Sequence, residues 1–93
     1  MLIYIINQEF SHDGRNTHTW NWYYSNQSTA WKEYVKSVKE FEKAHPDFLL
    51  AKDYNGDYCR DGEDYQYYEM EYNRTTSLHK VKFTFSTQQL ING

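Results

Sequence analysis

The segment WKEYVKSVKEF, residues 31–41, decides the fold because its apolar side chains recur at the spacing of one helical face. This i, i+3, i+4, i+7 pattern predicts an amphipathic helix. The apolar positions are Trp31, Tyr34, Val35, Val38 and Phe41. We expect Ser28 to be the N-cap of the helix. Pro46 disfavours helical geometry in the residue before it, so the helix should end near Ala44.

On both sides of this helix, short apolar or alternating segments predict strands of a sheet. The expected strands are residues 2–6, 19–24, 48–54, 65–72 and 79–87. Turn signals occur at Asp13-Gly14, Asn55-Gly56 and Asp61-Gly62. The continuous apolar run at residues 2–6 is typical of a strand in the middle of a sheet. The order β-β-α-β-β-β predicts an α+β fold: a mostly antiparallel sheet of four to five strands with the helix on one face.

Length and composition predict a single compact domain over residues 1–93, because a chain this short can form only a small core. Aromatic residues make up 19% of the chain and can fill that core with few aliphatic residues. The N-terminal run MLIYII is far shorter than the roughly 20 residues needed to span a membrane. A single cysteine, Cys59, cannot form an internal disulfide. We therefore expect a cytoplasmic protein that makes no membrane contact.

The segment DYNGDYCRDGEDYQYYEMEY, residues 53–72, concentrates acidic and tyrosine side chains. It contains seven of the thirteen acids and one of the ten bases, which gives a net charge of −6. Nine bases and six acids elsewhere give +3, and the whole chain has a formal charge of −3. Such asymmetry affects the choice of partner and the rate of association more than the fold.

Part of this acidic charge is expected to pair within the sheet. If Met70 lies opposite Val81, then Glu71 faces Lys80 and Glu69 faces Lys82. Cross-strand pairs of opposite charge each contribute about 0.2 to 1 kcal/mol. The acids near the turns then remain without a partner. These are Asp53, Asp57, Asp61, Glu63 and Asp64.

Motifs for metal binding or catalysis are weak in this sequence. The acidic segment does not match the ligand spacing of an EF-hand loop. The histidines at positions 12, 18, 45 and 79, together with Cys59, have no recognised zinc-site spacing. Asp57 and Asp61 flank Cys59 and disfavour its thiolate. We therefore expect no enzyme activity, cofactor or metal site. Two alternatives stay open: weak cation binding at the acidic turn, and acid-base chemistry, which would need a pocket with convergent polar groups.

Protein binding is the function that this composition favours. Tyrosine offers a large contact area at low cost in conformational entropy, and carboxylates attract a basic partner. Carboxylates on strands, about 3.3 Å apart per residue, can also imitate a row of phosphates. The plain alternative is a charged turn that only keeps the domain in solution. The predicted partner-binding residues are Asp53, Tyr54, Asp57, Tyr58, Asp61, Glu63, Asp64, Tyr65 and Tyr67.

A second hypothesis is nucleic-acid binding through the helix. Four lysines fall within a narrow sector of the helical wheel and would form one edge. They are Lys32, Lys36, Lys39 and Lys43. Exposed aromatic side chains could stack on bases. The negative net charge is unfavourable for this function, because phosphate contacts dominate nucleic-acid affinity. Aromatic side chains beyond those that one helix can cover are also compatible with a homodimer.

In size, acidity, tyrosine content and lack of a catalytic motif, the chain resembles the small phage-encoded inhibitors of bacterial defence, the anti-CRISPR proteins among them. This resemblance implies a viral protein that acts by binding. It also implies an acidic surface that blocks the nucleic-acid channel of a host nuclease.

Overall fold

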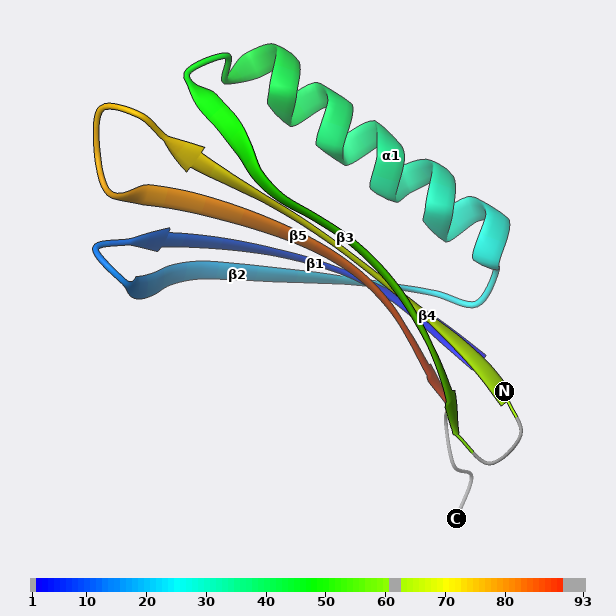
Figure 1. Ribbon diagram of the computed structural model, residues 1–93. Helices are drawn as coiled ribbons and strands as arrows, with labels where there is room; N and C mark the ends of the chain where they lie inside the picture. Colours follow the sequence, from blue (N-terminus) through cyan, green and yellow to red (C-terminus); the bar gives the residue numbers. More distant parts are fainter. Residues whose placement is uncertain (1, 61–62, 90–93) are drawn as a thin grey trace.

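The computed structural model describes residues 2–60 and 63–89, which form five strands and one helix (Figure 1). The elements are β1 (Leu2–His12), β2 (Arg15–Tyr24), α1 (Gln27–Ala44), β3 (Phe48–Arg60), β4 (Glu63–Arg74) and β5 (His79–Gln89). The predicted order β-β-α-β-β-β and the α+β class are confirmed. Every strand is longer than its alternating pattern suggested.

All five strands form one antiparallel sheet in the order β2-β1-β5-β4-β3. The expectation that the N-terminal strand lies in the middle is only partly right. β1 is an interior strand between β2 and β5, while β5 occupies the centre. The predicted turn at Asp13-Gly14 is confirmed, since both residues have positive φ, 58° and 79°. Asp and Gly tolerate that geometry, and it suits a tight hairpin.

The helix ends where the sequence indicated but begins slightly earlier. Its N-cap is Asn26, whose side chain accepts a hydrogen bond from the Thr29 amide at 2.9 Å. The predicted cap, Ser28, lies inside the first turn instead. Asn and Ser are almost equally good caps, so propensity alone could not decide between them. At the other end the helix stops at Ala44, two residues before Pro46.

The core lies between α1 and one face of the sheet. Its helical side consists of Ala30, Tyr34, Val38 and Phe41, and its sheet side of Ile6, Tyr72, Val81, Phe83 and Phe85. The aromatic rings meet edge to face or tilted, with centroids about 5 to 6 Å apart, a favourable arrangement for such pairs. Trp31, the first residue of the predicted apolar stripe, is 39% exposed at the margin of this core.

The register between β4 and β5 differs from the predicted one by two residues. Met70 lies opposite Phe83, Tyr72 opposite Val81, and Glu71 opposite Lys82. A shift of two residues keeps every side chain on its predicted face, because strand side chains alternate with a period of two. The division of β4 into a core face and a polar face was therefore correct, although the register was wrong.

One face of the sheet bears the helix, and no other described element covers the opposite face, which we call the open face. α1 contacts β1, β2 and β5, and the β3–β4 hairpin extends past its N-terminal end (Figure 1). The β1–β2 turn and the β4–β5 connection lie together at the other end of the sheet. Within the described ranges, no helix is long and apolar enough to cross a membrane.

Candidate protein-binding site

The acidic, tyrosine-rich residues lie on the β3–β4 hairpin at the edge of the sheet. β3 and β4 pair from Phe48 opposite Arg74 to Arg60 opposite Glu63, with one irregularity between Leu50 and Lys52. The backbone register places Asp57 opposite Gln66, Tyr58 opposite Tyr65, and Cys59 opposite Asp64. Asp61 lies outside the described residues, as do the side chains of Asp57, Tyr58, Glu63, Asp64 and Tyr65.

Asn55-Gly56 was predicted to be a turn, but both residues lie inside β3. Gly56 is opposite Tyr67, and the Tyr54 ring folds over the glycine. A Cβ atom built on Gly56 would lie 2.7 Å from the Tyr54 ring. Gly56 therefore gives room for an aromatic ring on the open face, and such a ring offsets the weakening that a glycine causes inside a strand.

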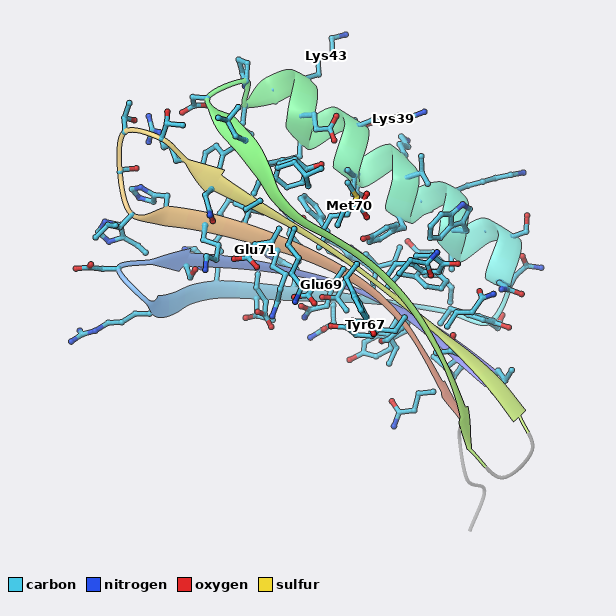
Figure 2. The ribbon with its side chains drawn as sticks, in the orientation of Figure 1. Lys39, Lys43, Tyr67, Glu69, Met70 and Glu71 are labelled. Atoms are coloured by element: carbon cyan, nitrogen blue, oxygen red, sulfur yellow. The ribbon has the colours of Figure 1, made fainter. Side chains whose placement is uncertain are left out.

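Tyr54 and Tyr67 are the described tyrosines of the predicted binding surface, and they lie on the opposite face of the sheet from Asp53, its one described acid. Their ring centroids are 6.1 Å apart, and Tyr54 is 50% exposed. The Lys52 ammonium lies 5.8 Å from the centre of the Tyr54 ring, within the range of a cation–π contact. Figure 2 shows Tyr67 on the same face as Glu69 and Glu71, opposite the helix. The tyrosines therefore adjoin the charged part of that face.

Glu69 and Glu71 are neutralised by lysines of neighbouring strands, as predicted. Glu71 contacts Lys80 at 2.7 Å, while Glu69 contacts Lys52 at 3.2 Å and Lys82 at 3.8 Å. Because of the shifted register, Glu71–Lys80 and Glu69–Lys82 are diagonal rather than direct neighbours. Lys52 is a further partner that the sequence reasoning missed. These carboxylates are part of the sheet and contribute little free negative charge.

Lys82 lies between two strands that supply acids. Its ammonium is 3.5 Å from Glu9 on β1 and 3.8 Å from Glu69 on β4. Burial alone would lower the pKa of Lys82, but the Glu9 and Glu69 carboxylates outweigh it and raise that pKa. Lys82 therefore links Glu9 of β1 to Glu69 of β4 on the open face.

Asp53 has a different environment from Glu69 and Glu71. It is exposed and lies opposite Met70, which Figure 2 shows between the sheet and the helix. Among the described residues it has no salt-bridge partner. Burial raises the pKa of the Tyr34 hydroxyl, and the Asp53 carboxylate raises it further. Asp53 thus lies beside the core without an ion-pair partner among the described residues.

The lysine edge of α1 is exposed, as the helical wheel predicted. Lys39 and Lys43 point away from the sheet in Figure 2. None of the four lysines has a salt-bridge partner among residues 2–60 and 63–89. A shallow depression of about 440 Å³ beside them is lined by Trp31, Lys32, Val35, Lys36, Lys39 and Glu40. This edge combines positive charge with one partly exposed indole ring.

Comparisons with known proteins give no match: no protein-family model, curated protein or solved structure is similar to this chain.

Proposed function

We propose that this protein is a non-enzymatic inhibitor or adaptor that binds a basic, nucleic-acid-handling protein in the cytoplasm through its β3–β4 hairpin. The observation that supports this most strongly is the division of the acidic segment into two parts. Glu69 and Glu71 are paired with lysines, whereas Asp53 on β3 has no such partner in the described part of the chain. The remaining acids follow closely on the hairpin, with Arg60 as the only base in residues 53–64.

The position of the hairpin also favours this function. It extends past the end of the helix, so a partner can approach it without displacing the core (Figure 1). Tyr54 offers a half-exposed ring, and tyrosines are enriched among residues that dominate binding energy. Carboxylates on the same hairpin would accelerate association with a basic surface and disfavour acidic competitors.

An acidic strand pair can also compete with nucleic acid for the same channel. Strand residues rise by about 3.3 Å each, close to the roughly 3.4 Å spacing of successive phosphates along the axis of one DNA strand. Inhibition of a nuclease in this way would agree with the resemblance to phage anti-defence proteins. The proposal therefore includes mimicry of nucleic acid as its mechanism.

The test is affinity capture from bacterial lysate treated with nuclease, followed by mass spectrometry. The test variant reverses four hairpin charges: Asp57→Lys, Asp61→Lys, Glu63→Lys and Asp64→Lys. We expect the unmodified protein to capture a basic protein that this variant no longer captures. The circular dichroism spectrum of the variant should match that of the unmodified protein. Two smaller variants form a matched pair. Asp57→Lys/Asp61→Lys reverses two charges on the hairpin, and Glu33→Lys/Glu40→Lys reverses two charges on the helix, so both change the total charge by the same amount. Capture that is equally strong with all variants would contradict the proposal.

A second candidate function is nucleic-acid binding through the lysine edge. The specific observation in its favour is Trp31, which is 39% exposed beside Lys32 and Lys36. An indole ring can stack on a base while lysines contact phosphates. Such binding to single-stranded DNA or RNA should weaken steeply with salt and should be lost in Lys32→Glu/Lys36→Glu. Absence of binding at low salt would eliminate this candidate.

A further inference from the structure

Two histidines that are distant in sequence lie next to each other at the turn end of the sheet. His12 ends β1 and His79 begins β5, and the antiparallel register makes them direct partners. Their ring centroids are 4.3 Å apart, with an angle of 30° between the ring planes. The β1–β5 pairing therefore brings together two imidazoles that sequence spacing could not connect.

The backbone around the two histidines is tied together. Asp13 adopts positive φ in the β1–β2 turn and donates its amide hydrogen to the Leu78 carbonyl at 3.0 Å. This hydrogen bond joins the turn to the connection between β4 and β5. The two strand ends that bear the imidazoles are thus fixed relative to each other, which reduces the entropy that a ligand bridging them would cost.

Ser77 orients one of the rings. Its Oγ lies 2.6 Å from Nδ1 of His79, so this nitrogen is engaged and Nε2 is left for a ligand. Histidines that bind metals commonly use one ring nitrogen for the metal while a neighbouring polar group holds the other. Ser77 is therefore placed to fix the His79 ring for metal binding.

The surroundings of His79 do not repel a cation strongly. A cavity of about 470 Å³ adjoins His79, and its lining includes Asp13, Arg74 and Lys80 but not His12. The two basic residues are paired, since Arg74 contacts Asp47 at 2.6 Å and Lys80 contacts Glu71 at 2.7 Å. The positive charge beside the cavity is thus largely compensated.

We propose that His12 and His79 together bind one divalent transition-metal ion, with water completing its coordination. A metal bound by two imidazoles at about 2.0 to 2.1 Å needs the two nitrogens about 3 Å apart. Because Ser77 holds the His79 ring, whose centroid lies 4.3 Å from that of His12, we infer that the His12 side chain turns to bring the two nitrogens to this separation. No group of three or more His, Cys, Asp or Glu in the described residues could hold a metal, so these residues supply the two imidazoles as ligands. Imidazole donors and the Irving–Williams order favour Cu²⁺ over Ni²⁺ and Zn²⁺.

The test is titration of the Cys59→Ser protein with NiCl₂ and CuCl₂ by isothermal titration calorimetry, because the thiol would otherwise compete for the metal. We expect one ion per chain and tighter binding of Cu²⁺. His12→Gln and His79→Gln should each weaken binding at least about tenfold, and Ser77→Ala should weaken it by a smaller factor. The matched controls are His18→Gln and His45→Gln, which should bind like the parent.

A second readout is thermal stability. An ion that bridges β1 and β5 binds only the folded state and should raise the melting temperature, and this rise should vanish in His12→Gln. Two results would overturn the proposal. The first is that the parent binds no metal. The second is that binding is lost in His18→Gln or His45→Gln rather than in the His12 and His79 variants.

Discussion

The two parts of the acidic, tyrosine-rich segment have similar compositions but different environments. In residues 68–72, Tyr72 packs in the core, while Glu69 and Glu71 contact lysines of other strands. In residues 53–67, the strands run from beside the helix to beyond its N-terminal end, Tyr54 is half exposed, and Asp53 has no ion-pair partner in the described part of the chain. Strand pairing, rather than composition, therefore decides which carboxylates and tyrosines can meet a partner.

The largest expected effect separates a core tyrosine from a hairpin tyrosine. Tyr72 is 2% exposed, and its ring centroid lies 5.3 Å from that of Phe41. Tyr72→Ala should lower the free energy of unfolding by about 3 to 5 kcal/mol, as for other buried aromatic residues. Tyr54→Ala, at a half-exposed position, should cost less than about 1 kcal/mol. Urea denaturation measures both, and equal losses would contradict the contrast.

The next effect concerns pH. Burial and a hydrogen bond to Glu42 raise the pKa of the Tyr72 hydroxyl, and burial raises that of Tyr34. A hydroxyl whose pKa is higher in the folded state than in the unfolded state stabilises the folded protein. This contribution is fully present below the pKa of the unfolded state, about 10, and is lost as the pH rises above it. We expect the unfolding free energy to fall above pH 10 by up to about 1.4 kcal/mol per pH unit for each group.

The conservative variant Tyr72→Phe isolates one of these groups. It removes the hydroxyl and keeps the ring, so its stability should fall less steeply than that of the unmodified protein between pH 10 and 12. Lys82 acts in the same direction in both proteins, because its pKa is also raised. Identical slopes in urea denaturation across this range would show that the Tyr72 hydroxyl does not titrate differently in the folded state.

A smaller effect tests the ion pairs of the open face. Lys82→Met removes the ammonium that lies between Glu9 and Glu69. The nearly buried Glu69 carboxylate then keeps one lysine contact among the described residues, Lys52. We expect a loss of about 1 to 2 kcal/mol in the free energy of unfolding. The control Lys36→Met, on the exposed lysine edge, should change stability by less than about 0.5 kcal/mol. Similar losses in the two variants would refute the stabilising role of Lys82.

The smallest effect concerns Gly56. In Gly56→Ala the new methyl group would meet the Tyr54 ring, which can rotate away because it lies at the end of a flexible side chain. We expect a stability change below about 1 kcal/mol, with a clear shift in the Tyr54 ring resonances measured by NMR. Unchanged Tyr54 resonances would show that this ring does not cover Gly56.

Much of the fold could be predicted from local patterns. The stripe from Trp31 to Phe41 located the helix, and alternation assigned the faces of β4 and β5. The register could not be predicted, because a shift of two residues keeps the same faces and still allows Glu71 to reach Lys80 diagonally. Asn55-Gly56 misled the turn prediction because both residues pair with β4, opposite Tyr68 and Tyr67, and tertiary strand pairing overrides local turn propensity.

The candidate sites depended more strongly on tertiary structure. The sequence identified the acidic hairpin and the lysine edge, since both are local runs of charge. It could not identify the contact between His12 and His79, which arises only when β1 pairs with β5. The ion pair between Lys52 and Glu69 likewise depends on the pairing of β3 with β4.

The most direct test of the proposed function is the dissociation constant for the captured basic partner, measured in parallel for two charge variants. The hairpin variant is Asp57→Lys/Asp61→Lys/Glu63→Lys/Asp64→Lys. The other variant is Glu69→Gln/Glu71→Gln. We predict that the hairpin variant weakens binding more than about 100-fold, because repulsion replaces attraction at the contact. The Glu69/Glu71 variant should change it less than about threefold, because those carboxylates already pair with lysines. Equal losses in both variants, or full affinity in the hairpin variant, would contradict the account.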